Sequence, residues 1–335
     1  MLGAICNAGH EVTEGAPLGG PVTSTVSTAA RWTLTTGYRW QNSFRHFRGD
    51  HEERERIENG TEVENRTHMF DVGLSYQINP RWSLTVSAPI TRTERTAHRN
   101  GTVTTSGGLG DLSVGAKFWL FRPPSENQQN IQFGFAIKLP TGDPNVTNFV
   151  APNVINVDQS IQLGDSGTGF SLDYMAYKSI GRFTVFSTGA YLFNPKNTHA
   201  PTGWVRNGNP PPGIGYQGFS QPGTVFSVPD QYLWQAGGGY ATPWVPGLAL
   251  TGVARMEGVP ARDLIGREDG FRRPGYAVSV GPGFMYQRGR NTWSASVPIA
   301  VKRDRTRSVP DIRNNSHGDA AFADFLLLIG YSTSF

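Results

Sequence analysis

Apolar and polar residues alternate along most of this chain with a period of two. From Trp32 to Trp40, one face carries mainly aromatic and aliphatic side chains, and the other carries Thr, Gly and Arg. The segments 70–78 and 82–90 repeat the pattern. Because successive side chains of a β-strand point to opposite faces, the pattern predicts strands with one apolar and one polar face.

Twelve segments follow this period and are predicted to be strands: residues 32–41, 70–78, 82–90, 112–120, 131–139, 170–178, 183–193, 231–241, 248–257, 276–287, 292–302 and 321–335. The face of the seventh is ambiguous, because Phe186 and Leu192 oppose Val185 and Tyr191. The connections between the segments are alternately tight and long. An even strand number with such connections is typical of outer-membrane barrels.

The two-faced strands predict an all-β fold, a transmembrane antiparallel up-and-down β-barrel of twelve strands with short periplasmic turns and long extracellular loops. No run of about 18 apolar residues is present to form a spanning helix. The terminal aromatic, Phe335, closes the last segment and resembles the signal by which the bacterial assembly machinery recognises its barrels. The predicted location is therefore the outer membrane, with both termini periplasmic.

The barrel is predicted to comprise residues 29–335, and residues 1–28 a signal remnant followed by a periplasmic segment. Met1 to Ala8 resembles the end of a signal peptide's apolar region. The small, polar stretch from Gly9 to Thr28 either plugs the barrel or hangs free. The single cysteine, Cys6, excludes an internal disulfide and a multi-cysteine metal site. Neither a metal nor a cofactor is predicted.

Aromatic residues and turn residues mark the two ends of the predicted barrel. Tryptophan prefers a membrane boundary because its ring is apolar and its N–H is not. The predicted periplasmic girdle contains Trp32, Trp82, Trp244, Trp293, Tyr331 and Phe335.

At the opposite end, Asn59-Gly60 and Asn100-Gly101 predict extended hairpins with type I′ turns. The Pro-rich connection from Asn194 to Pro229 either folds into the lumen as a constriction or stays outside.

The alternation of inward and outward side chains along the strands predicts that nine charged residues face the inside of the barrel: Arg39, Asp71, Asp111, Lys138, Asp173, Arg255, Glu257, Lys302 and Asp324. An Arg or Lys that faced lipid at the bilayer midplane would destabilise the barrel by roughly 2 to 4 kcal/mol, so these charged residues are expected to face inward. Two readings are open: a constriction that selects solutes, or charge pairs that brace the wall. Small inward residues leave room for a narrow pore. The inward apolar residues would instead close it or line an apolar pocket: Met175, Met285, Trp119, Leu326 and Leu328.

Arginines gather in two external connections: Arg262, Arg267, Arg272, Arg273, Arg303, Arg305, Arg307 and Arg313. They either bind the phosphates of lipopolysaccharide or are simply solvated. A formal net charge of +4 gives no specific support for nucleic-acid binding. The predicted partners are outer-membrane lipid, a small-molecule solute and the barrel assembly machinery, and a protein partner or a second copy of the chain is left open.

Enzyme signatures are weak, and no catalytic residue is predicted. Outer-membrane phospholipases use a Ser and a His two residues apart, whereas Ser316 and His317 are adjacent here. An omptin-like site needs paired carboxylates with a His on the rim. Asp111, Asp173 and His68 could supply these groups, but nothing in their spacing demands it.

Three glycine motifs resemble those of the outer-membrane barrels named for the meta-pathway of phenol degradation: Gly108-Leu109-Gly110-Asp111-Leu112, Leu139-Pro140-Thr141-Gly142-Asp143 and Gly164-Asp165-Ser166-Gly167-Thr168-Gly169. The glycines suit positive φ or close packing, and Asp111, Asp143 and Asp165 are expected to bind backbone N–H groups at the rim. The resemblance implies a channel for small organic solutes, including aromatic compounds. The alternative is a scaffold barrel whose loops bind a protein partner or neighbouring copies.

Overall fold

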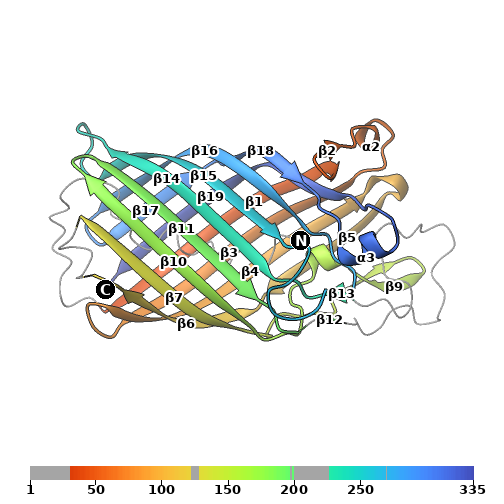
Figure 1. Cartoon of the computed structure of the whole chain (residues 1–335), viewed down its shortest axis with the longest axis horizontal. Coiled ribbons are helices and arrows are strands. Elements are labelled where there is room, and N and C mark those ends of the chain that lie inside the picture. The colour runs from red at the N-terminus through yellow and green to blue at the C-terminus, as the bar shows by residue number, and fades with distance from the viewer. Residues whose placement is uncertain (1–30, 122–127, 197, 200–225, 269) are drawn as a thin grey trace.

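The chain forms a closed barrel of twelve antiparallel strands within the residues that the computed structural model describes, which are 31–121, 128–196, 198–199, 226–268 and 270–335 (Figure 1). Ten barrel strands are continuous: β1 (Trp32–Arg48), β3 (Val63–Gln77), β4 (Trp82–Ala97), β7 (Gln129–Leu139), β10 (Gly169–Ile180), β11 (Phe183–Phe193), β14 (Gln231–Ala241), β15 (Leu248–Val259), β16 (Gly275–Arg288) and β19 (Ala320–Ser334). Two are interrupted: β5 (Thr102–Leu109) continues as β6 (Leu112–Trp119), and β17 (Asn291–Ser296) continues as β18 (Ile299–Asp304). The predicted twelve-strand all-β barrel is confirmed.

Pairing of β1 with β19 closes the barrel, from Thr33 opposite Ser334 to Phe47 opposite Ala320. A closed sheet has no free edge, so its backbone hydrogen bonds are satisfied between neighbouring strands even in lipid. The predicted segment 1–28 lies outside the described residues. No helix among the described residues is long and apolar enough to cross a membrane.

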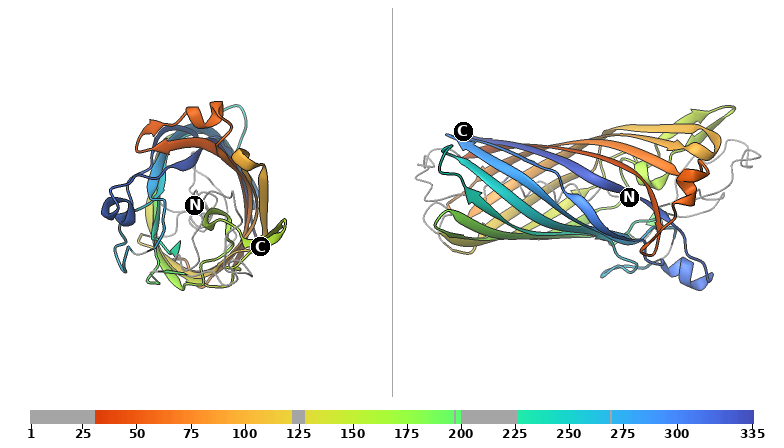
Figure 2. Two further views of the ribbon diagram at one scale, coloured as in Figure 1. Left: turned by 90° about the vertical axis from the view of Figure 1, so that its right-hand side faces the viewer. Right: turned by 90° about the horizontal axis from the view of Figure 1, so that it is seen from above.

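The two ends of the barrel differ in their connections (Figure 2). The turn end has short links, such as residues 181–182 between β10 and β11 and 289–290 between β16 and β17. The loop end carries β2 (His51–Glu52), α2 (Glu55–Glu58), η2 (His98–Asn100), β8 (Thr147–Val150), β9 (Asn153–Asn156), η4 (Gln159–Ile161), β12 (Thr198–His199), β13 (Phe226–Ser227) and α3 (Val309–Arg313).

The two predicted hairpins extend beyond the barrel wall, but their turns are not of type I′. A type I′ turn needs positive φ at both central residues. Asn59 has φ of −94° and ends α2, and only Gly60, with φ of 60°, is left-handed. In the second hairpin, η2 precedes Gly101, whose φ is 66°. Each turn is therefore a helical turn closed by a left-handed glycine, which the dipeptides alone did not reveal.

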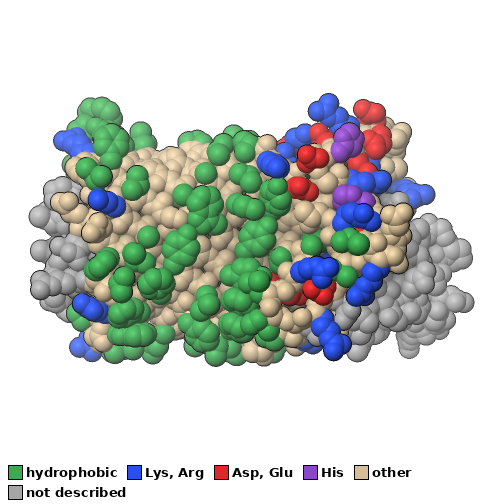
Figure 3. All heavy atoms as spheres, in the orientation of Figure 1, with side chains coloured by type: hydrophobic (Ala, Val, Ile, Leu, Met, Phe, Trp, Pro, Cys, Tyr) green, Lys and Arg blue, Asp and Glu red, His purple; other side chains and the backbone are tan. Residues whose placement is uncertain are grey.

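The barrel is apolar outside and polar inside. Large apolar side chains cover its middle, and charged side chains gather at the loop end (Figure 3). Leu84 and Phe133 on the outer face are each 49% exposed, whereas Lys138 on the inner face is 2% exposed. The seventh strand, β11, has Val185 exposed on the outer face and Phe186 buried on the inner face, so its facing is resolved and Phe186 is an apolar exception inside. Such a surface suits lipid and leaves a polar lumen.

A bulge overturns the prediction that Lys302 faces the lumen. Val278 pairs with Lys302 and the next residue, Ser279, pairs with Ala300, so Val301 has no partner on β16. One extra residue reverses the facing of everything after it. Lys302 is therefore exposed, with its ammonium group 5.6 Å from the ring centre of Tyr276. Arg303 is buried instead.

Candidate functional site

A carboxylate between two arginines bridges the lumen. Arg39 on β1 donates from Nη1 and Nη2 to the two oxygens of Glu257 on β15, at 3.1 and 2.9 Å. Arg255 donates to Glu257 Oε2 at 2.6 Å. Three barrel strands separate β1 from β15 along the shorter arc, so this contact spans the lumen. Gln41 accepts from Arg39 at 2.7 Å, and Asp71 on β3 interacts electrostatically with Arg39. We call Arg39, Arg255 and Glu257 the strand bridge.

The glycine motifs pack against one another at the rim, next to a second charge cluster. A Cβ on Gly142 would lie 2.4 Å from the carbonyl oxygen of Leu163, and one on Gly164 would lie 2.4 Å from that of Gly142. No other residue fits at either position without displacing backbone. The expected backbone contacts of the three aspartates are present: Asp111 accepts from Gly142 at 2.9 Å, Asp143 from Asn145 at 2.8 Å and Asp165 from Gly167 at 2.8 Å. Lys138 lies 2.5 Å from Asp165 and 3.4 Å from Asp111.

Part of the connection between β7 and β10 folds into the lumen, and we call residues 157–165 the inner segment. Val157 and Ile161 are buried, and Asp158 has no exposed surface. Asp158 accepts two hydrogen bonds from Arg273, at 2.9 and 3.0 Å, and its other neighbour, Arg95, lies 3.5 Å away. The amide of Gln159 donates to the carbonyl oxygen of Ser227 at 2.6 Å. The inner segment is thus held at several points.

The arginines that hold Asp158 come from opposite walls. Arg95 lies on β4 and Arg273 leads into β16, and four barrel strands separate β4 from β16 on one side and six on the other. Burial by itself raises the pKa of Asp158, but the two guanidinium groups outweigh it and hold the pKa well below its usual range. We call Arg95, Asp158 and Arg273 the loop bridge.

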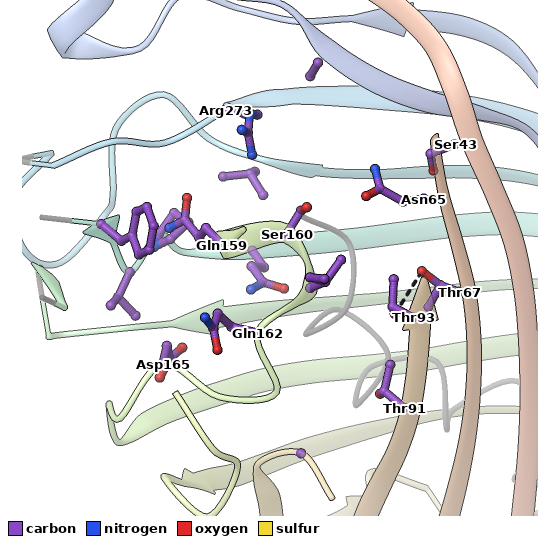
Figure 4. A pocket seen from close by; sticks show the side chains of 18 of the residues that line it. Ser43, Asn65, Thr67, Thr91, Thr93, Gln159, Ser160, Gln162, Asp165 and Arg273 are labelled. Atoms are coloured by element: carbon purple, nitrogen blue, oxygen red, sulfur yellow. Dashed lines mark hydrogen bonds between the residues drawn. The ribbon is translucent and has the colours of Figure 1, made fainter. Parts of the chain in front are cut away.

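A cavity of about 170 Å³ lies between the inner segment and the barrel wall. On the wall, β1, β3 and β4 present Ser43, Asn65, Thr67, Thr91 and Thr93 (Figure 4). On the inner segment, Gln159, Ser160 and Gln162 line the opposite side. Ile161, Phe226, Val228 and Val259 supply an apolar part of the lining. The cavity therefore has polar groups on two opposite sides and a separate apolar part.

Most of the charged residues that the sequence predicts to face the lumen lie on the inner face in the structure. Arg39, Asp71, Asp111, Lys138, Arg255 and Glu257 are buried, and Asp173 leans over Gly134, whose hypothetical Cβ would meet its carboxylate at 2.2 Å. Asp324 lies beside the register shifts between β1 and β19, bound to Arg45 and Arg303 at 2.7 Å each, with its side chain 37% exposed. Asp111, Lys138 and Glu257 line the cavity.

The aromatic residues of the predicted girdle lie at the turn end. The ring centres of Trp32 and Tyr76 are 4.7 Å apart, those of Trp82 and Phe118 are 4.8 Å apart, and Trp293 packs on Tyr331 at 5.6 Å. Trp244 and Phe335 are 77% and 56% exposed. Their boundary role stays a prediction.

Sequence reasoning missed the loop bridge. The sequence predicts that Arg273 binds lipopolysaccharide or is solvated, yet it is bound to Asp158 inside the barrel. Arg272, Arg303 and Arg305 are also buried, in ion pairs with Asp263, Asp324 and Asp311. The one sequence signal for the inner segment was its apolar content, Val157 and Ile161 beside Asp158, in a stretch assigned to a loop.

The residues weighed for catalysis do not converge. His68 is exposed on the outer face and bonds with Tyr38 at 2.9 Å, whereas Asp111 and Asp173 face the lumen. His317 contacts the carbonyl oxygen of Arg305 at 2.7 Å, and Ser316 donates to that of Asp311 at 3.4 Å. The described part of the chain holds no group of three or more His, Cys, Asp or Glu side chains suited to a metal ion.

No protein-family model matches this chain, and no curated protein sequence matches it either. Among solved structures, an outer membrane channel from Pseudomonas putida F1 is similar, with a TM-score of 0.61 at 14% identity over 91% of this chain and 96% of that one. The β domain of the Bordetella autotransporter Brka gives a TM-score of 0.49 at 12% identity, over 91% of this chain and 100% of that one. The translocator domain of NalP from Neisseria meningitidis gives 0.45 at 13% identity, over 92% and 90%. The closed twelve-strand barrel and the similarity to the Pseudomonas putida F1 channel show that the chain has the fold of an outer-membrane β-barrel.

Proposed function

We propose that this protein is a bacterial outer-membrane channel through which small organic solutes diffuse. The observation that carries the proposal is the cavity of about 170 Å³ inside the barrel, lined by hydroxyl and amide groups between the inner segment and the wall. A barrel whose only task was to display loops would not need such a space. The strand bridge, which crosses the lumen between β1 and β15, would limit the size of what passes.

Small aromatic compounds are among the proposed solutes, as the glycine motifs imply. The apolar part of the cavity lining, which includes Phe226 and Val228, supports this preference. A ring could lie against these side chains while its substituents face the polar side.

The loop end is proposed to face the cell exterior, and both chain termini the periplasm. The alternation of short turns and long loops supports this orientation. In this orientation Phe335 would be presented to the assembly machinery, and the exposed arginines Arg262 and Arg313 would meet lipopolysaccharide. Cleavage of the long loops by protease added to intact cells would support the orientation, and protection of every loop would contradict it.

Liposome swelling tests the channel proposal directly. Purified protein in liposomes should admit small uncharged solutes, such as sugars and cyclic polyols, faster than protein-free liposomes do. Thr67→Trp, which fills the cavity, should slow swelling strongly. Val86→Trp is the matched control, because Val86 is 46% exposed on the outer face and the added ring would meet lipid. Swelling equal to that of protein-free liposomes for every solute would reject the proposal.

A further inference from the structure

Four polar atoms in the cavity lining have no hydrogen-bond partner among the described residues: Gln159 Oε1, Ser160 Oγ, Gln231 Oε1 and His199 Nε2. All four are buried within the protein. Buried polar atoms are nearly always hydrogen-bonded, so unpaired ones at a cavity point to a ligand or water. Two of the four are amide oxygens, which can only accept, and His199 Nε2 accepts or donates according to its tautomer.

The neighbouring Gln162 shows that this is not a general property of the inner segment. Its Oε1 accepts from Val146 at 2.9 Å, and its Nε2 donates to Val157 at 3.0 Å, so its amide is used inside the protein. Gln159 differs, because its Nε2 donates to Ser227 and thereby fixes the amide with Oε1 left over. The free Oε1 acceptor of Gln159 thus has a fixed position.

The charged groups of the lining are already matched. Lys138 is bound between Asp111 and Asp165, Glu257 belongs to the strand bridge, and Arg273 belongs to the loop bridge. An ionic ligand would have to break one of these buried pairs, which is costly. The cavity therefore favours an uncharged molecule.

We infer that the cavity binds an uncharged small molecule that carries O–H or N–H donors on one edge and an apolar face on the other. The donors would meet Gln159, Ser160 and Gln231, and the apolar face would lie on Phe226, Val228 and Val259. A cavity of about 170 Å³ suits one six-membered ring, since an apolar cavity of about 150 Å³ holds benzene. The inference rests on the proposed function, because it specifies which solutes the channel would admit.

Equilibrium dialysis of the purified full chain in detergent tests this with three six-ring probes. These are cyclohexane-1,2-diol, its dimethyl ether, which has no donor, and cyclohexanecarboxylate, which is charged. We expect saturable binding of the diol, and binding of the ether and the carboxylate that is weaker by about tenfold or more. Equal binding of the diol and the ether, or no diol binding, which would mean that water fills the site, would overturn the inference.

Two glutamines on β14 give a matched pair of variants. Gln231→Leu removes an acceptor from the cavity and should weaken diol binding by about fivefold or more. Gln235→Leu changes the same residue type on the same buried face of β14, outside the cavity lining, and should leave binding unchanged. Heat-modifiable gel migration confirms that each variant is folded. Equal binding by both variants would reject the assigned site.

The dialysis experiment tests the ligand site and the swelling experiment tests the channel, so the two proposals can be rejected separately. Swelling without diol binding would overturn this inference and leave the channel proposal standing. Diol binding without passage of any solute would support the site and reject the channel.

Discussion

The lumen is crossed twice by a carboxylate held between arginines, and the two crossings differ in which part of the chain carries the carboxylate. In the strand bridge, Arg39, Arg255 and Glu257 all lie on barrel strands. In the loop bridge, Arg95 lies on a strand and Arg273 precedes one, but Asp158 belongs to the inner segment. The backbone of the strand bridge is fixed in the wall, so only a change of its side-chain rotamers would open it. The loop bridge would also open if the inner segment withdrew, so in the proposed channel it is the crossing suited to control access.

The largest effect is expected from Glu257→Gln. This change leaves Arg39 and Arg255 close together without their carboxylate, and neither can leave the wall. Removing one partner of a buried ion pair costs about 3–5 kcal/mol, so the free energy of unfolding should fall by about that amount. Urea unfolding in lipid vesicles measures it.

The control for this change is Glu94→Gln. Glu94 is 46% exposed and 3.7 Å from Arg66, which is itself 54% exposed. Exposed pairs of this kind contribute about 0–1 kcal/mol. If Glu257→Gln unfolded at the same urea concentration as Glu94→Gln, the strand bridge would not brace the barrel.

Asp158→Asn should change the conductance of the channel more than it changes the free energy of unfolding. The neutral amide no longer holds Arg95 and Arg273 together, and the inner segment can move out of the lumen while the barrel stays closed. We expect a several-fold rise in single-channel conductance and a smaller loss of unfolding free energy than in Glu257→Gln. Asp143→Asn is the control, because Asp143 lies in the same connection but binds only backbone within it. Unchanged conductance in Asp158→Asn would show that the loop bridge does not restrict passage.

Acidification should open the loop bridge only at low pH. The folded pKa of Asp158 lies well below its usual value because burial is outweighed by Arg273 and Arg95. Because the folded pKa is lowered, the ionised carboxylate of Asp158 stabilises the folded protein fully at pH values above the unfolded pKa of about 3.9. This stabilisation is lost as the pH falls from there toward the folded pKa. Conductance should therefore stay constant from pH 8 to pH 5 and rise only below about pH 4. Opening between pH 7 and 5, or the same response in Asp158→Asn, would assign the titration to another group.

The strands and the loop bridge also differ in how far the sequence predicts them. The period of two follows from strand geometry, so it located all twelve strands and the inward facing of Arg39, Asp71 and Glu257. The strand ends were harder, because β1 continues to Arg48 and β3 begins at Val63, where the residues project beyond the apolar belt and lose the pattern.

The loop bridge has no such local signal. Asp158 is buried because Arg95 and Arg273 approach it from two walls that the chain reaches far apart in sequence. Nothing near residue 158 encodes that encounter, and the charge of Arg273 looks the same in a solvated loop as in a buried pair. The cavity is equally non-local, because its polar groups come from three strands and from the inner segment.

The smallest effect is expected at Lys302, and its neighbour Arg303 makes the comparison sharp. The bulge at Val301 points Lys302 away from the lumen and buries Arg303, which donates to the carbonyl oxygen of Ala323 at 3.1 Å. Lys302→Gln should therefore leave the ratio of cation to anion permeability unchanged, whereas Arg303→Gln should shift it toward cations. Reversal potentials in a salt gradient measure this ratio. If Lys302→Gln shifted the ratio and Arg303→Gln did not, the uninterrupted alternation would describe this strand better than the bulge does.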